Sequence, residues 1–415
     1  MRRVVITGLG ALTPLGNNVG DFWENIKLGK SGAGPITRFD TTHFKTKFAC
    51  ELKDFKPEDY FDRKELRKID PFCIYAMIAA DEAVKDAGLD IAAIDATRAG
   101  VLWGSGYGGV LSVQDQLIDY GIHGRLPKFS PFFISRMIIN MAAGFISIRH
   151  GFKGINYAPV AACASSNLTI LESLNQIRWG KADIVIAGGS EAAIAEAGIG
   201  GFGASMALST NNDQAATACR PYDATRDGFV MGEGAGALII EELEHAKRRG
   251  AKIYGELIGG AATADSYHIT ASHPDGEGAI NAMELGLKDA QITKTDVDYI
   301  NAHSTSTPLG DVSEIKAIQT VFGDHAGKLN ISATKSMTGH LLGGAGAVEA
   351  IICLKAMNES IVPPTINTQT IDPEIPQGLN LTLGKAQKRD VSVAMSNTFG
   401  FGGHNVITIF RKYQG

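Results

Sequence analysis

The stretch NLTILESLNQIRWGKADIVIAGGSEA, residues 167–192, contains the pattern that decides the fold class. Leu168, Leu171 and Leu174 recur at helical spacing, and the short apolar run 183–192 that follows is typical of a buried strand. The same alternation of helical and β-forming segments continues in both directions along the chain. It predicts an α/β protein in which helices cover parallel sheets.

Working outward from this stretch gives two series of elements of similar order and length. The segments expected to form strands are 2–8, 98–109, 183–192, 252–260, 298–303, 329–334, 392–396 and 406–410. The segments expected to form helices are 22–29, 71–88, 167–182, 241–251, 278–290, 312–323 and 346–358. We therefore expect two related halves, 1–250 and 251–415, and the last two strands are expected to form a hairpin around a glycine-rich turn.

The overall composition excludes several classes of protein. A chain of 415 residues can bury a sizeable core in two domains or in one intertwined unit. Its formal net charge of −5 gives no general attraction for nucleic acid or an anionic membrane surface. No apolar stretch reaches the 18 or more residues expected of a membrane span. We expect a cytoplasmic protein with no nucleic-acid or membrane partner.

The five cysteines are scattered and form no pattern with metal-ligand spacing, so we expect free thiols and no metal centre. One of them, Cys163, lies among alanines and serines just before the predicted helix. A thiol at a helix N-terminus meets free backbone N–H groups and the helix dipole, which predicts a pKa below about 8.5. A buried structural cysteine is the alternative interpretation of this local pattern.

Two histidines lie near the ends of predicted strands. His303 follows the segment DYINA, and His340 lies in a glycine-flanked turn that leads into a helix. Ligands gather at the carboxyl ends of strands in α/β sheets, so both histidines are candidates to converge with Cys163 on one cleft. Lys335, five residues before His340, is expected to tune the charge of this site or to be an ordinary surface lysine.

The turn SNTFGFGG near the C-terminus is a second candidate for the site. Asn397, Phe399 and Phe401 could supply backbone N–H groups to an oxyanion and cover it with aromatic rings. Other glycine-rich runs carry no such argument. The glycines at positions 8, 10 and 16 miss the spacing of a dinucleotide-binding fingerprint, so no nicotinamide site is expected.

These motifs together resemble the β-ketoacyl-acyl carrier protein synthases, most closely the KAS II type. The resemblance rests on Cys163 in AACASS, His303 in NAHSTSTPLGD, His340 in TKSMTGHLLGGAGAVEA, the run RPYDATRDGFVMGEGAG at 220–236 and the final GFGGHN. It covers nearly the whole chain. It implies the thiolase fold, in which two similar halves form five layers of the order α-β-α-β-α, and usually a homodimer.

The resemblance also implies an activity and a set of roles. The cysteine accepts an acyl group from acyl carrier protein, the two histidines promote decarboxylation of malonyl-carrier protein, and the resulting carbanion attacks the acyl thioester, as in fatty acid elongation. Lys335 supports the histidines, with Glu349 in the surrounding charge network, and the N–H groups of Cys163 and Phe401 form the oxyanion hole. Further residues expected at the substrate are Thr305, Thr307, His268, Tyr107 and the gating Phe401 with Phe399.

The implied partner is an acyl carrier protein, which is acidic and needs a basic docking patch. The residues matching such a patch are Lys64, Arg67, Lys68, Arg125 and Lys128. An ordinary charged helix face is the alternative interpretation. No organic cofactor is expected, because the carrier brings its own phosphopantetheine, and a monovalent cation behind the site is left open.

Three positions depart from the family pattern: Tyr107, where a smaller aliphatic residue is common, Ser304 in place of glycine, and His404 in place of threonine. They leave the acyl chain length undecided. They also keep open a ketosynthase of a type II polyketide or aryl polyene pathway. A non-catalytic chain-length factor, which would form a heterodimer, lacks the cysteine. A thiolase would need a second active cysteine, whereas Cys353 lies in an apolar run typical of a core.

Overall fold

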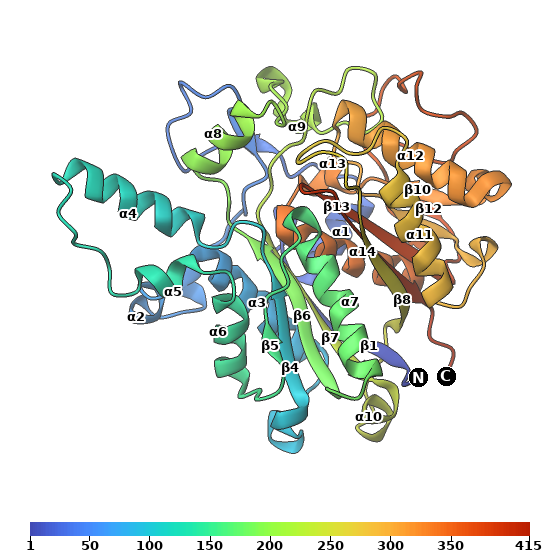
Figure 1. The fold of residues 1–415 in the computed structure, drawn as a ribbon, viewed down its shortest axis with the longest axis horizontal. Helices are drawn as coiled ribbons and strands as arrows, with labels where there is room; N and C mark the ends of the chain where they lie inside the picture. Colours follow the sequence, from blue (N-terminus) through green and yellow to red (C-terminus); the bar gives the residue numbers. More distant parts are fainter.

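The computed structural model describes all residues, 1–415, and confirms the α/β class (Figure 1). Five strands of the main ten-stranded sheet belong to the first part of the chain. They are β1 (Val4–Leu12), β4 (Ala99–Gly104), β5 (Asn156–Tyr157), β6 (Ile184–Glu191) and β7 (Gly234–Glu242). Five belong to the second part. They are β8 (Gly255–Ala264), β9 (Tyr299–Asn301), β10 (Asn330–Ser332), β13 (Val393–Gly400) and β14 (His404–Arg411).

The two groups of strands have the same order. The sheet runs β10-β9-β13-β14-β8-β1-β7-β6-β4-β5, so each half places its first strand at the junction and its last strand beside it. Only two residue pairs, Val5 with Glu256 and Ile6 with Gly255, join β1 to β8. The repetition of strand order within the two halves gives a structural basis for the similarity of the two series along the sequence.

The expectation of purely parallel sheets is wrong, because each half is mixed. β4 is parallel to β5 and β6, and β9 is parallel to β10 and β13. β7 is antiparallel to both β1 and β6, and β14 is antiparallel to both β8 and β13. In the second half the cause is local, since a turn of three residues, 401–403, can join β13 and β14 only as an antiparallel hairpin.

Helices complete the layers. Those that pack on the strands are α3 (Pro71–Asp86), α6 (Met141–His150), α7 (Ser165–Arg178), α11 (Glu277–Asp289), α12 (Pro308–Phe322) and α14 (Ala345–Glu359). α7 and α14 contact strands of both halves, whereas α3 and α6 pack on the first half and α11 packs on the second with α12 beside it. The order is therefore helix, strand, helix, strand, helix, as expected for the thiolase-like fold.

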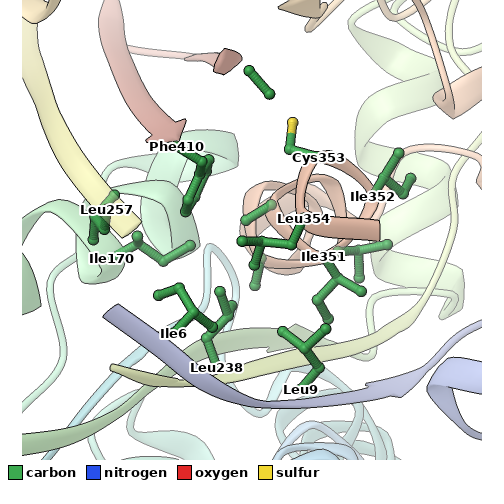
Figure 2. Packing of buried hydrophobic residues seen from close by; sticks show 14 of the residues in the cluster. Ile6, Leu9, Ile170, Leu238, Leu257, Ile351, Ile352, Cys353, Leu354 and Phe410 are labelled. Carbon is green, nitrogen blue, oxygen red and sulfur yellow. The ribbon is translucent and has the colours of Figure 1, made fainter. Parts of the chain in front are cut away.

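The central layer contains the largest apolar cluster. Figure 2 shows α14 end-on, with Ile351 and Leu354 between Ile6 and Leu9 of β1 on one side and Phe410 of β14 on the other. Two further clusters lie under α3 and under α11 and α12. Because α7 and α14 are covered on both sides, nearly every side chain of α14 is apolar or small, and its amphipathic character is lost.

The remaining elements lie outside these layers. They are α1 (Val19–Lys27), β2 (Gly34–Pro35), β3 (Phe48–Ala49), α2 (Arg63–Leu66), α4 (Val110–Ile122), α5 (Phe133–Met137), α8 (Glu196–Ala204), α9 (Ala215–Ala218), α10 (Leu243–Arg248), α13 (Lys335–Thr338), β11 (Ile361–Val362) and β12 (Gln387–Lys388). Figure 1 shows α4 and the segment after it extending away from the body as an arm. No helix combines the length and the apolar composition needed to span a lipid bilayer.

Candidate active site

One cavity of about 340 Å³ brings together side chains from both halves of the chain. Cys163 comes from the first half, and His303 and His340 come from the second. The other residues named from the sequence that line this cavity are Ser304, Thr305, Thr307, Phe399 and Phe401. Segments more than 100 residues apart in sequence therefore meet around a single thiol.

Cys163 lies in a short 3₁₀ turn, Ala162–Ala164, that leads directly into α7. The turn is held by Ser165, whose hydroxyl donates to the carbonyl of Ala162 at 2.7 Å and accepts the N–H of Ala161 at 2.9 Å. Ala162 has φ of 48°, a left-handed conformation that costs an alanine about 1 kcal/mol or more. The thiol is thus presented at a helix N-terminus by a strained turn.

The expected low pKa of this thiol is not what the structure gives. Burial raises the pKa of Cys163 to about 12, and the negative charge of Glu191 acts in the same direction. The charge of Lys335 and hydrogen bonds from the backbone N–H groups of Phe401 and of Cys163 itself lower the pKa but do not outweigh burial. The prediction counted the helix terminus and missed the desolvation. The two N–H groups are nevertheless directed at the sulfur, so they are placed to bind an oxyanion that forms beside it.

The two histidine rings contact each other edge to face, with centroids 5.3 Å apart. His340 is positioned by its backbone, whose N–H donates to the carbonyl of Val230 at 2.7 Å, and its ring packs on Phe229. Burial, and then the charge of Lys335, lower the pKa of His303 and His340 well below 6.5. Both rings are therefore neutral near pH 7, and each can donate one N–H.

Lys335 is buried rather than solvated. It is 1% exposed, and its ammonium forms an ion pair with Glu349, which is 3% exposed on α14. Burial raises the pKa of Glu349 to about 7, while Lys335 opposes that shift. The surface alternative for Lys335 is therefore excluded, and its charge lies where it acts on both histidines and on Cys163.

Sequence reasoning missed Glu314, a buried carboxylate on α12. It accepts the backbone N–H groups of His303 at 2.9 Å and of Ser304 at 2.7 Å, and the side-chain amide of Asn397 at 3.1 Å. The hydroxyl of Ser304 also donates to it at 2.8 Å, which gives this departure from the family pattern a structural place. Glu314 follows from no motif, and its only sequence signal is a charged residue among the apolar positions of the helix 312–323.

A second missed carboxylate is Glu191, at the end of β6. It is completely buried, and its carboxylate accepts the N–H groups of Gly106 and Gly343, which lie against each other. The run GGSEA at the end of a predicted strand was its only signal in the sequence.

The glycine-rich turn is shorter than expected, because β13 continues to Gly400. Phe399 packs on His303 with ring centroids 5.6 Å apart, and Phe401 packs on Phe202 at 6.0 Å. The N–H of Gly402, at φ of 89°, donates to the carbonyl of Ile269 at 2.7 Å. Both phenylalanines thus line the cavity, Phe399 from the end of β13 and Phe401 from the turn that follows.

Two residues expected at the substrate do not line this cavity. His268 is exposed, and its ring nitrogen accepts the N–H groups of Thr270 and Ala271, which do line the wall. Tyr107 packs on Phe202, a residue of the cavity wall, with ring centroids 5.7 Å apart, and lines a neighbouring surface groove with Met137 to Asn140 and residues 156–158. Burial raises the pKa of Tyr107, and its phenol is close enough to Cys163 for the charge of that thiol to act in the same direction. His404 is exposed at the start of β14.

The cationic residues predicted for docking are all exposed. Lys64 lies on α2 and Arg67 and Lys68 follow it, whereas Arg125 and Lys128 belong to the arm after α4. In Figure 1, α2 and the arm lie on the same side of the molecule. No three His, Cys, Asp or Glu side chains are grouped to hold a metal ion. Cys353 is fully buried in the core, as its apolar surroundings in the sequence predicted.

Two family models match the chain. Residues 1–246 match the N-terminal domain of β-ketoacyl synthases, and residues 254–369 match the C-terminal domain. The chain is 50% identical over 416 aligned residues to 3-oxoacyl-[acyl-carrier-protein] synthase 2 of Staphylococcus aureus strain COL, covering 100% of this chain and 99% of that one. It is 48% identical to the enzyme of the same name from Synechocystis, with the same coverage.

Solved structures agree with this assignment. A β-ketoacyl synthase from Burkholderia phymatum matches with a TM-score of 0.92 at 34% identity, and covers 100% of both chains. The ishigamide ketosynthase/chain length factor matches with a TM-score of 0.93 at 33% identity, also over 100% of both chains. A type II polyketide ketosynthase in complex with its acyl carrier protein matches at 0.91 and 34% identity, over 99% of this chain and 100% of that one.

Proposed function

Because this chain belongs to the β-ketoacyl synthase family, we propose that it condenses an acyl group held on Cys163 with malonyl-acyl carrier protein during fatty acid elongation. The products are 3-oxoacyl-acyl carrier protein and CO₂. The observation that carries the proposal is the single cavity in which one thiol faces two neutral histidines. The full-length identity to 3-oxoacyl-[acyl-carrier-protein] synthase 2 enzymes supports the same reaction.

The first half-reaction is acyl transfer. The Cys163 sulfur attacks the thioester carbonyl of the acyl carrier protein and expels the pantetheine sulfur, which takes up the proton that the Cys163 thiol gives up. A thiol of raised pKa needs help at this step, and the positive charge of Lys335 together with the two N–H groups directed at the sulfur provides it. The same N–H groups, of Cys163 and Phe401, stabilise the tetrahedral oxyanion.

The second half-reaction depends on the histidines. The malonyl group loses CO₂, and the electron pair of the broken carbon–carbon bond becomes an enolate whose oxygen accepts N–H bonds from His303 and His340. Neutral rings suit this role because each holds one proton to donate and does not quench the enolate. The enolate carbon then attacks the acyl thioester, and the Cys163 thiolate leaves as 3-oxoacyl-acyl carrier protein forms.

Intact mass spectrometry tests the first half-reaction. We expect incubation with saturated acyl-carrier proteins to add one acyl group to the wild-type chain, and no acyl group to Cys163→Ala. His303→Ala and His340→Ala should still acquire the adduct but fail to release CO₂ from malonyl-carrier protein. Condensation by Cys163→Ala would refute the mechanism.

A type II polyketide or aryl polyene ketosynthase is the second candidate, since solved relatives of 26% to 34% identity include such enzymes. The bulky Tyr107 beside Phe202 favours this alternative, because a phenol near the acyl site suits a short, unsaturated or aryl chain. The same mass assay separates the two functions. Adducts from polyene carriers alone would indicate the specialised pathway, and no adduct from any carrier would indicate a non-catalytic chain-length factor.

The proposed carrier docks on the exposed cations Lys64, Arg67, Lys68, Arg125 and Lys128. A local basic patch on a protein of net charge −5 steers an acidic partner to one face. Charge reversal at Lys64 and Arg67 should raise the KM for carrier-bound substrates several-fold, and the effect should weaken as salt is added. An unchanged KM at low salt would leave these residues as ordinary surface charges.

We also propose that two copies form a homodimer through the arm and the neighbouring edge of the first half. Exposed apolar side chains gather on these elements: Leu117, Ile118, Ile122, Leu126, Ile134 and Ile148 are 47% to 79% exposed. β5 is the last strand of the sheet, so its outer edge is unpaired. Light scattering should give twice the chain mass of 44.0 kDa, and Ile122→Asp should reduce it to that of a single chain.

No organic cofactor enters the proposal, and a monovalent cation fits one place. Buried oxygen atoms of Glu349 on α14 and Ser396 on β13, which pack against each other, lack hydrogen-bond partners, and the negative charge of Glu314 acts on Glu349. A bound K⁺ there would stabilise these oxygens behind the histidines. Replacing K⁺ by tetramethylammonium should lower the melting temperature. We propose a cytoplasmic location, which the five free thiols support.

A further inference from the structure

Glu191, at the end of β6, accepts four hydrogen bonds beside the nucleophile Cys163. Its Oε1 accepts the hydroxyl of Ser105 at 2.8 Å and the N–H of Tyr107 at 3.1 Å. Its Oε2 accepts the N–H groups of Gly106 at 2.8 Å and Gly343 at 3.0 Å. All four donors come from two segments that are more than 200 residues apart in sequence, so a single carboxylate connects them.

These two segments flank the catalytic turns. A Cβ on Gly106 would lie 3.4 Å from the carbonyl oxygen of Ala162, the residue before Cys163. The other segment begins at His340, and its Leu342 has φ of 46°, as Ala162 has φ of 48°. Left-handed backbone in residues other than glycine persists only where the surroundings impose it. The Glu191 carboxylate lies between these two strained turns.

We infer that Glu191 is a positioning residue whose carboxylate fixes the loop 105–107 against the turn after His340, and that Gly106 of this loop in turn supports the backbone at Ala162, next to Cys163. The inference rests on the proposed function. A buried carboxylate costs several kcal/mol in desolvation, and an apolar residue would fill the space without that cost. The four converging donors explain why a carboxylate is needed: without it, the buried N–H of Gly343 and the part-buried N–H groups of Gly106 and Tyr107 would lose their acceptor.

The charge of Glu191 has a second effect at the same place. It raises the pKa of the Cys163 thiol and that of the Tyr107 phenol. The other titratable groups around the sulfur are Lys335, which lowers its pKa, and the two neutral histidines in the cavity wall. Removing the Glu191 charge should therefore make Cys163 more acidic while it disturbs the geometry for acyl transfer, and a purely structural residue would not produce these opposite effects.

Glu191→Gln tests the inference, with Glu82→Gln as the matched control. Like Glu191, Glu82 is a carboxylate that accepts backbone N–H groups, in this case two at 2.8 Å each. Burial raises the pKa of Glu82 to about 7, as it does that of Glu191. Glu82 lies on α3, outside the cavity. Each variant is alkylated with iodoacetamide over a pH series, and the modified Cys163 peptide is quantified. The alkylation midpoint is the pH at which the rate of Cys163 modification is half-maximal. For Glu191→Gln we expect this midpoint to move down by about one pH unit or more. The rate of acyl transfer should fall at least about tenfold, because the Gln amide faces two N–H donors.

The control should keep the wild-type midpoint and the wild-type acyl transfer. An unmoved midpoint and unchanged acyl transfer in folded Glu191→Gln would overturn the inference. If that variant does not fold, Ser105→Ala removes one donor and keeps the charge; it should slow acyl transfer several-fold without moving the midpoint, and wild-type acyl transfer would refute the positioning role. Alkylation needs no carrier protein, so it remains informative even if the proposed function fails.

Discussion

Replacing Lys335 should lower the free energy of unfolding and should also change how that free energy depends on pH. In Lys335→Met the carboxylate of Glu349, 3% exposed, loses its only ion-pair partner. Breaking a buried pair by removing one partner costs about 3–5 kcal/mol, because the remaining charge stays desolvated. That is a large part of the 5–15 kcal/mol that usually stabilises a folded protein.

The sign with pH follows from Glu349, whose pKa is already raised to about 7. Without Lys335 this pKa rises further, so the folded variant binds a proton that the unfolded chain has lost above about pH 4.5. Its stability is then lost as pH rises, and the deficit should be greater at pH 8 than at pH 6. In the double variant Lys335→Met with Glu349→Leu no charge remains, and most of the lost stability should return.

Urea unfolding at pH 6 and pH 8 measures the deficit, and CO₂ release from malonyl-carrier protein measures the second effect. Lys335 lowers the pKa of both histidines. Its loss should therefore raise the pH at which the decarboxylation rate begins to fall on acidification (the acid limb of the pH–rate profile) toward pH 6.5. A deficit below about 1 kcal/mol at pH 8, with an unmoved acid limb, would refute the argument that this buried ion pair sets the charge of the site.

Three further outcomes follow from the site. The wild-type decarboxylation rate should be constant from pH 7.5 to below pH 6.5, since the pKa values of His303 and His340 lie well below 6.5. A fall in rate with a midpoint above pH 6.5 would contradict the conclusion that both rings are neutral. Tyr107→Leu should let Cys163 accept acyl chains several carbons longer, read by intact mass, and an unchanged chain-length limit would remove Tyr107 from the acyl site. Ser304→Gly should lose about 1–3 kcal/mol in urea unfolding, because one hydrogen bond to a buried carboxylate is removed; equal stability would show that the hydroxyl is not needed there.

Local sequence patterns determined most of the elements. The helical spacing after Cys163 predicted α7 and the presentation of the thiol at its N-terminus, and strand-end placement predicted that both histidines meet it. Short-range periodicity and turn chemistry encode such features, because they depend on neighbours within a few residues. β7 was missed altogether, because its glycine-rich start at 234–237 was not recognised as part of a strand. Its antiparallel direction was not predictable either, since the direction of a strand depends on how the long connection before it crosses the fold.

The electrostatic character of the site was decided only by the tertiary structure. The thiol pKa moved opposite to the local prediction because burial by segments from both halves outweighs one helix terminus. The carboxylates of Glu191 and Glu314 are functional candidates only because donors from remote segments converge on them. His268 matched a motif, yet its loop turns the ring outward. Residue types that carry chemistry can be found in a sequence, whereas desolvation and partners arise where distant segments pack together.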